Sequence, residues 1–468
     1  MEYDESLGEG IQRLLGDVRL KHEEAIMNCD SAYRNTGENS FIAYGNVHLI
    51  QGDSMHLYGD TLYYYGNTKL AEVRNNVRLV NNEGATLTTH FLNYDRNTEV
   101  GYYFNRGEIN DNENNLKSVT GYYYSETKDF ISIDSVVLTN PEYVMYSDTL
   151  KYNTASEIAF FFGPTEIVSD SSFIYCENGW YNTITDISQY NKNAYLIKKA
   201  QTLKGDSLYY DRKNGFGKAF INVELSDTVE QIVLKGNYAI YREEPEYAFL
   251  TDSAQFIQIS DDDSLFLHGD TITSEIDTSG EHKIIKAYHK VKTYRHDLQG
   301  KCDSLVYSFR DSVIQLHIEP VLWSEENQLT AEYIEIHTVN KKADHVMLQN
   351  AAFITSQEDT IRFNQIKGKF IVGYFKNGEL NIIYVNGNAQ SLYFPKDDED
   401  LVGANKGSSS DMRILMKDGD PHKIYFLKEP DAVLHPVGEL LKNELYLQGF
   451  NWLDKQRPKD KLDIFRWE

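Results

Sequence analysis

The chain has 468 residues, 41% of them hydrophobic, and a formal net charge of −25. This acidity argues against a nucleic-acid partner and against binding to anionic membranes, because both need a basic surface. No run of about 18 apolar residues occurs, so we expect no transmembrane segment. The 34 tyrosines and only nine prolines favour strands over helices.

A short phrase centred on Asp-Ser or Asp-Thr recurs along the chain. Its clearest copies are separated by 30, 88, 58, 64 and 33 residues, and their aspartates are Asp30, Asp60, Asp148, Asp206, Asp270 and Asp303. A unit of about 29–33 residues divides these gaps, which is typical of stacked repeats. The sequence therefore predicts an all-β fold, an elongated repeat β-jellyroll of stacked, solenoid-like rungs with about 29–33 residues per repeat.

A second phrase in each repeat resembles Gly-Asn-Val-x-Leu, as at residues 45–49, 75–79 and 221–225. Around it, apolar and polar residues alternate with a period of two, which predicts strands with one apolar and one wet face. In the repeat near residue 220 the apolar positions are Ala219, Ile221, Val223 and Leu225. The inward positions predicted for the clearest repeats are Ala43, Val47, Leu49, Ala71, Val73, Val77, Leu79, Leu87 and Leu92.

The repeat divides the chain into three predicted segments. It is clearest over residues 12–110, and it continues over 111–395 with a looser stretch at 111–200. Residues 396–468 are predicted to begin with a mobile acidic and Gly/Ser-rich insertion at 396–411. Strands at Met412–Met416 and Ile424–Leu427 follow, and a tail from about Pro436 is expected to cap the last rung.

The recurring aspartates have two interpretations. Carboxylates stacked about 5–10 Å apart would suit a glycoside hydrolase, whereas Asp-Ser/Thr in every rung is typical of turns and corners. We favour the corner, because a catalytic pair should be local rather than spread along the chain. We therefore expect no catalytic residues and no enzymatic activity.

Metal-binding patterns are weak. His282, His289 and His296 are separated by odd steps, so His289 would face away from the other two on one strand. The acidic runs Asp261–Asp263 and Asp397–Asp400 lack the spacing of calcium loops and are expected to be solvated turns. We expect neither a metal site nor a cofactor.

Cysteines and tyrosines are expected to fill the interior. Cys29, Cys176 and Cys302 lie far apart and are predicted to be separate buried thiols. Tyrosine triplets such as Tyr63–Tyr65 and Tyr122–Tyr124 could stack on sugars or fill the corners of the sheet. The corner role is favoured, because adjacent residues of a strand face opposite sides.

Several of these phrases together resemble the OstA-like family, which includes the lipopolysaccharide-transport proteins LptA, LptC and the N-terminal part of LptD. The resemblance is most specific over residues 12–110 and rests on Gly45-Asn46-Val47, Asn76-Val77-Arg78-Leu79, Leu92-Asn93-Tyr94-Asp95 and Gly101-Tyr102-Tyr103. A later phrase, Gly387-Asn388-Ala389, also fits long multi-repeat members of Gram-negative bacteria.

The resemblance implies a β-taco, a folded sheet whose inner face is an apolar groove. It implies a non-enzymatic periplasmic protein that shields the lipid A acyl chains of lipopolysaccharide, as part of a bridge between inner and outer membranes. The nine inward residues would then line the groove. Lipopolysaccharide and other Lpt-type jellyrolls, stacked end to end, are the implied partners. Residues Met1–Ser6 do not resemble an export signal, so we expect that the signal has been removed.

Two alternatives remain open. A closed β-solenoid that fills its own core would serve as a scaffold or interaction protein. A β-helical polysaccharide-processing enzyme would need a local carboxylate pair in a cleft.

Overall fold

The computed structural model describes residues 10–22, 25–52, 55–82, 84–111, 113–260, 263–397, 400–417, 419–436 and 438–467. Predictions for residues 1–6, 261–262 and 398–399 concern positions outside these ranges. The chain divides into two compact units, residues 1–217 and 218–468, which we call unit 1 and unit 2. Each unit is a stack of antiparallel strands, so the predicted all-β repeat jellyroll is confirmed.

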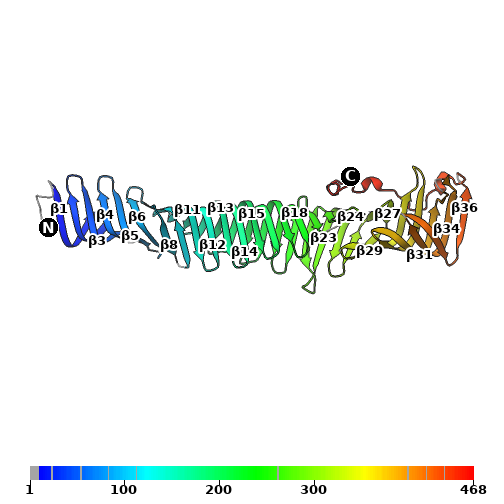
Figure 1. The fold of residues 1–468 in the computed structure, drawn as a ribbon, viewed down its shortest axis with the longest axis horizontal. Helices are drawn as coiled ribbons and strands as arrows, with labels where there is room; N and C mark the ends of the chain where they lie inside the picture. The colour runs from blue at the N-terminus through cyan, green and yellow to red at the C-terminus, as the bar shows by residue number, and fades with distance from the viewer. Residues whose placement is uncertain are drawn as a thin grey trace. The chain divides into compact units, whose positions relative to one another are not determined.

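Strands of unit 1 follow one another in chain order (Figure 1). They are β1 (Ile11–His22), β2 (Ala25–Asn35), β3 (Ser40–Gln51), β4 (Met55–Tyr65), β5 (Leu70–Asn81), β6 (Thr86–Asp95), β7 (Val100–Tyr103), β8 (Gly107–Asp111), β9 (Asn114–Ser118), β10 (Thr120–Tyr124), β11 (Asp129–Asn140), β12 (Tyr143–Asn153), β13 (Ile158–Ser169), β14 (Ser172–Asn182), β15 (Ile187–Lys198) and β16 (Gln201–Asp211). Strand β17 (Phe216–Asp227) begins at the boundary with unit 2.

Unit 2 repeats the same plan with more interruptions. Its strands are β18 (Ile232–Arg242), β19 (Tyr247–Thr251), β20 (Gln255–Gln258), β21 (Leu265–His268), β22 (Thr271–Ile276), β23 (Lys283–Arg295), β24 (Leu298–Ser308), β25 (Val313–His317), β26 (Val321–Ser324), β27 (Asn327–Thr330), β28 (Tyr333–Val339), β29 (Lys342–Gln357), β30 (Phe363–Lys376), β31 (Glu379–Tyr393), β32 (Lys396–Asp397), β33 (Asp400–Leu401), β34 (Gly403–Lys417), β35 (Asp420–Leu427) and β36 (Asp431–Pro436). Among the described residues, no helix is long and apolar enough to cross a membrane.

The aspartate of the recurring Asp-Ser/Thr phrase lies at a corner of the rung. In β3 the pairing with β4 skips from Tyr44 to Val47, and the two residues between them have positive φ, +74° at Gly45 and +45° at Asn46. The Asn46 amide donates to the Asp30 carboxylate at 3.0 Å, and Asn76 donates to Asp60 at 2.7 Å in the next rung. A Cβ on Gly45 would collide with the Asp30 carboxylate. Turn and corner chemistry therefore explains the recurring aspartates.

The corner folds each rung into two walls. In unit 1, wall A carries segments such as 47–51 and 55–59, and wall B carries segments such as 40–44 and 61–65. In unit 2, segments 291–295 and 298–302 belong to wall A, and 284–288 and 304–308 to wall B. The turns at the ends far from the corner form one lip on each wall, and the mouth is the opening between the lips.

Cross-strand pairing aligns the apolar residues of successive rungs into rows. On wall A of unit 1, Leu49 pairs with Leu57, Leu57 with Leu79, and Leu79 with Leu87. On wall B a second row runs through Ala43, Leu62, Val73 and Leu92. Directly paired residues of antiparallel strands point to the same face, so each row forms a continuous apolar stripe.

Two local predictions are wrong. Ile221 does not face inward: it has φ +57°, lies at a corner and is 56% exposed. The two looped-out residues of the corner interrupt the period-2 count that placed it inside. Residues 403–411 are not a loop but part of β34, where they pair with β31 on one side and β36 on the other. Gly407 lies against the Phe426 ring, where a larger side chain would collide.

The C-terminal tail is not a cap on the last rung, as its position in the chain suggested. Residues 438–467 run back along unit 2 beside β27 and β24 and include three short 3₁₀ turns, η2 (Lys442–Glu444), η3 (Asp454–Gln456) and η4 (Asp463–Phe465) (Figure 1). They lie on the outer face of wall A.

Three glutamines that lie in one row of wall A hold the tail there. Gln299, Trp323, Gln328, Thr355 and Gln365 are directly paired across β24, β26, β27, β29 and β30. Gln328 donates to the carbonyl of Asn451 at 2.7 Å and accepts from the amide of Leu453 at 2.6 Å. Gln365 makes the same pair of bonds, at 2.8 Å each, with Leu445 and Leu447. These side-chain amides satisfy hydrogen-bonding groups of the tail's backbone. The residues of the tail show no periodic pattern that would predict this position.

Candidate functional site

All nine residues predicted to line a groove lie in the interior of unit 1. Each is at most 7% exposed; the nine are Ala43, Val47, Leu49, Ala71, Val73, Val77, Leu79, Leu87 and Leu92. They come from β3, β5 and β6, where the corner turns their two strand halves toward each other. The facing predicted from the alternation therefore agrees with the burial of these side chains.

The two walls touch across this interior. A cavity of about 30 Å³ lies between Leu20, Met27 and Leu49 of wall A and Phe41, Leu62 and Tyr64 of wall B. This is room for roughly one or two water molecules. At these first rungs the side chains leave little space, so a guest between the walls there requires them to part.

Buried thiols belong to the same interior. Cys29, Cys176 and Cys302 are unpaired and at most 4% exposed. Burial raises the pKa of the Cys176 thiol to about 12 and also raises that of Cys302. The thiol stays protonated at neutral pH and is a weak nucleophile. The prediction of three separate buried thiols is confirmed.

A large polar hollow occupies the mouth of unit 1 farther along the chain. It has a volume of about 1030 Å³. From the side of lip A it is lined by Ala85, Asp111, Glu113, Asn114, Asn140, Glu142 and Tyr143, and from lip B by residues such as Lys128, Glu157 and Asp186. We call it the unit-1 hollow. Its rim carries both charges and amides, so its chemistry differs from that of the apolar interior.

One ion pair crosses the unit-1 hollow. Arg212 on lip B lies 2.7 Å from the Glu142 carboxylate on lip A, although the two residues are 70 positions apart. Both side chains are more than half exposed, so the pair contributes little stability. It marks where the two lips come within reach of a single ligand.

Three half-buried tyrosines line the unit-1 hollow, one from wall A and two from wall B. The rings of Tyr143 and Tyr181 meet edge to face with centroids 6.3 Å apart, and Tyr152 lines the hollow beside them. Burial raises the pKa of Tyr143 and of Tyr152 to about 12, so both hydroxyls stay neutral over the physiological range. The Tyr181 hydroxyl donates to Asp186 at 2.6 Å.

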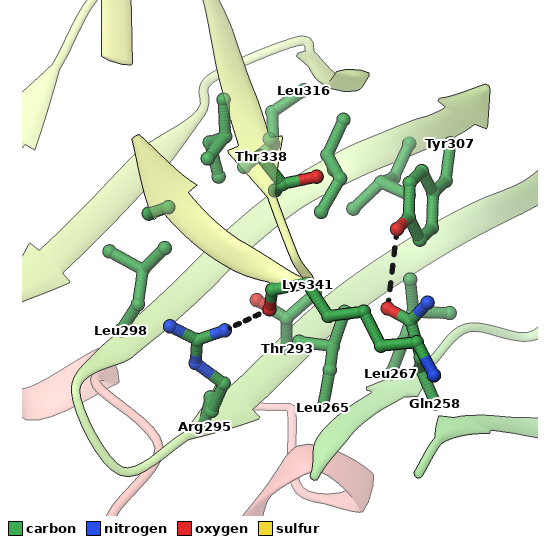
Figure 2. Close-up of a pocket in the computed structure, with 14 residues that line it drawn as sticks. Gln258, Leu265, Leu267, Thr293, Arg295, Leu298, Tyr307, Leu316, Thr338 and Lys341 are labelled. Atoms are coloured by element: carbon green, nitrogen blue, oxygen red, sulfur yellow. Dashed lines mark hydrogen bonds between the residues drawn. The ribbon is translucent and has the colours of Figure 1, made fainter. Parts of the chain in front are cut away.

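Contacts between the lips close the mouth of unit 2. Figure 2 shows Arg295 of lip A donating to the carbonyl of Lys341 on lip B, at 2.7 Å, and Tyr307 donating to Gln258 at 3.2 Å. Lys283 pairs with Asp227 across the mouth at 3.3 Å. Under these contacts a cavity of about 30 Å³ is lined by leucines that include Leu265, Leu267, Leu298 and Leu316 (Figure 2).

Several of the titratable residues considered for metal binding or catalysis lie at corners of the rungs. Within the described ranges, no three His, Cys, Asp or Glu side chains are placed to hold a metal ion. His289 lies at a corner, with Nδ1 3.4 Å from Asp303. Asp30 and Asp60 each bond to the asparagine of a corner, Asn46 and Asn76.

The sequence did not reveal the unit-1 hollow or the contacts between the lips. Arg212 and Glu142 each lie in an ordinary polar turn, and pairing them requires the rung-by-rung register and the fold angle at the corner. Successive turns along the chain alternate between the two lips, so the order of the strands does assign these two turns to opposite lips. It does not say how far apart the lips stand.

Comparison with known proteins gives one family match. Residues 1–148 and 144–206 match the family described as OstA-like protein. No curated protein matches the chain. Matching solved structures include LptH of Pseudomonas aeruginosa, described as the LptA-homologous periplasmic component of a conserved lipopolysaccharide transport device. It is 16% identical, with a TM-score of 0.23, and the match covers 25% of this chain and 82% of that chain.

Proposed function

Because residues 1–206 match the family described as OstA-like protein, we propose that the chain is a non-enzymatic periplasmic protein that binds and transports lipopolysaccharide. Unit 1 would shield the lipid A acyl chains between its walls while the sugars stay in water. Units of this kind, stacked end to end with other jellyroll proteins, would form part of a bridge between the inner and outer membranes.

The apolar rows of unit 1 are the observation that carries this proposal. The row through Leu49, Leu57, Leu79 and Leu87 continues without a polar residue to Ile109 and Leu116 of the next strands. Removing apolar surface from water is worth about 25 cal/mol per Å². An acyl chain that lies along such a row would therefore gain free energy from every rung it passes.

The walls are joined at the corner. They would therefore part by pivoting there, with the lips moving away from each other. The corner of β5 holds two residues of positive φ, Asn75 at +62° and Asn76 at +48°, and the strand ladder is interrupted there. An acyl chain that enters would replace contacts between the walls with contacts to itself. The apolar surface of both walls would therefore stay out of water as they open.

The end of unit 1 suits addition of a further strand. Within the described part of unit 1, β1 pairs with β2 and is the terminal strand of the stack (Figure 1). A terminal strand offers unpaired backbone groups to the strand of another chain. Pairing there would extend the apolar rows into the partner.

A closed scaffold is the second candidate, and the filled interior favours it. Val47, Val73 and Val77 are at most 1% exposed, and the space between the walls holds roughly one or two water molecules. In such a scaffold the walls never part, and function would lie on the outer surface.

Binding of lipopolysaccharide to the full chain separates these candidates. Native mass spectrometry of the delipidated protein with lipopolysaccharide should show a complex that Leu87→Arg abolishes. The matched control is Thr88→Arg, because Thr88 is the exposed neighbour of the 2% exposed Leu87. Both variants must show the strand signal of the wild type by circular dichroism. Absence of a complex with the wild type, or equal binding by both variants, would support the scaffold.

A further inference from the structure

The unit-1 hollow is chemically distinct from the groove beneath it. Its volume of about 1030 Å³ compares with about 30 Å³ between the walls of the first rungs. Sites of several hundred cubic ångströms with aromatic walls and a few convergent polar groups are typical of ligand pockets. We propose that the unit-1 hollow is a carbohydrate-binding site that takes a neutral oligosaccharide.

Aromatic rings supply the first part of a sugar site. Tyr143, Tyr152 and Tyr181 come from β12 and β14, two strands apart along the stack, and all three line the hollow while remaining half-buried. The edge-to-face contact between Tyr143 and Tyr181 fixes both rings. Fixed rings offer an apolar face to the C–H side of a pyranose, at little cost in side-chain entropy.

Hydrogen-bonding groups on both lips supply the second part. On lip A, Asn140 donates to the Asn114 side chain at 2.9 Å, which orients both amides at the rim. On lip B, the Thr183 hydroxyl donates to the carbonyl of Glu157 at 3.1 Å. Amides, hydroxyls and carboxylates together provide donors and acceptors for the hydroxyl groups of a sugar.

The balance of charge selects a neutral ligand. Of the 17 lining residues, five are acidic and three are basic. A phosphate would face Glu142, Glu157 and Asp186, whereas a polyamine would face Arg212 and Lys213. Neither an anionic nor a cationic ligand would therefore find opposite charges along the whole hollow. A ligand rich in hydroxyl groups can donate hydrogen bonds to the carboxylates and accept them from the basic side chains.

The ion pair across the mouth shows that one ligand can reach both lips. Arg212 and Glu142 bond at 2.7 Å while each stays more than half exposed. A sugar that bridges the lips would exchange this pair for hydrogen bonds to its own hydroxyls. In unit 2 the lips also bond to each other, there through Arg295 and the backbone carbonyl of Lys341 (Figure 2).

This inference deepens the proposed function and rests on it only for the source of the sugar. An acyl chain between the walls and a sugar in the mouth are the two ends of one glycolipid. The site itself depends on the tyrosines and the lips, so it can be tested without lipid.

The test uses the full chain and a lipid-free neutral oligosaccharide, maltoheptaose, followed by saturation-transfer NMR and calorimetric titration. We expect saturation of sugar protons and a measurable affinity. Tyr143→Ala and Arg212→Gln should each weaken that affinity about tenfold. Tyr146→Ala is the matched control, because Tyr146 lies three residues from Tyr143 on the outer face and is 47% exposed; it should leave the affinity unchanged.

The outcomes distinguish the two proposals. Binding of lipopolysaccharide without any saturation of maltoheptaose would overturn the carbohydrate site and leave the proposed function standing. Stronger binding of inorganic phosphate or spermine than of the sugar would also overturn it. Because Tyr143→Ala could disturb folding, Arg212→Gln on the exposed lip decides the matter: wild-type affinity in that variant would contradict a site that spans both lips.

Discussion

Replacing Gln328 by leucine should release the C-terminal tail from unit 2. The Gln328 side chain is 1% exposed, donates to the carbonyl of Asn451 and accepts from the amide of Leu453. Each such bond contributes about 0.5–1.5 kcal/mol net, so the loss of both costs about 1–3 kcal/mol. That range corresponds to a 5–150-fold increase in the population with a detached tail.

Hydrogen exchange of the full chain, followed by mass spectrometry, measures this population. The Leu453 amide and its neighbours should exchange faster by that factor in Gln328→Leu, while β24 and β27 keep their protection. The matched control is Gln315→Leu on β25, which lies on wall B away from the tail. Unchanged exchange of residues 445–457 in Gln328→Leu would refute the conclusion that the row of glutamines holds the tail.

Three further predictions concern the interior, the corner and the tyrosines. Leu92→Ala should lower the free energy of unfolding by about 2–5 kcal/mol in denaturant titrations, because Leu92 is 1% exposed. Ile221→Ser should change that free energy by about 0.5 kcal/mol or less, because Ile221 lies at a corner and is 56% exposed. Gly45→Ala should cost about 1–2 kcal/mol in the same assay, because φ is +74° there; no change would refute the role of the corner. Burial raises the pKa of Tyr143 and Tyr152 from 10.0 to about 12, so the stability that these neutral hydroxyls contribute should be complete below pH 10 and decline up to about pH 12. Tyrosinate absorbance in the native chain should lag behind that of the unfolded chain in this window, and coincident titrations would contradict the burial.

The repeat and its facing could be predicted from local patterns. The recurring aspartate indicates the number of rungs, because each corner needs similar turn chemistry. The hydrogen bond from Asn46 to Asp30 is one example. Alternation identified inward residues such as Val47 and Leu79, because a strand has a strict period of two. Ile221 marks the limit of this reasoning. It is the first of the two looped-out residues of its corner, the position that Gly45 holds in β3, so its side chain leaves the alternation although Ala219 and Val223 on either side stay buried.

The features that depend on long-range geometry could not be predicted. The contact between Arg212 and Glu142 needs the angle between the walls, which is set by packing across the whole rung. The path of the tail needs Gln299, Gln328 and Gln365 to align across strands, and these positions are spread over 67 residues of sequence. Whether the walls stay closed depends on the free energy of their contacts with each other relative to that of their contacts with a ligand. No single sequence motif determines this difference.

Site-specific photo-crosslinking in cells tests the central claim most directly. A photoreactive residue at position 47 or 79 would lie between the walls, because Val47 is 1% and Leu79 is 3% exposed. The neighbouring positions 48 and 78 pair across β3, β4 and β5 on the outer face of wall A. The proposed function predicts that lipopolysaccharide is captured from positions 47 and 79 and not from 48 and 78. Capture from 48 and 78 but not from 47 and 79 would contradict it.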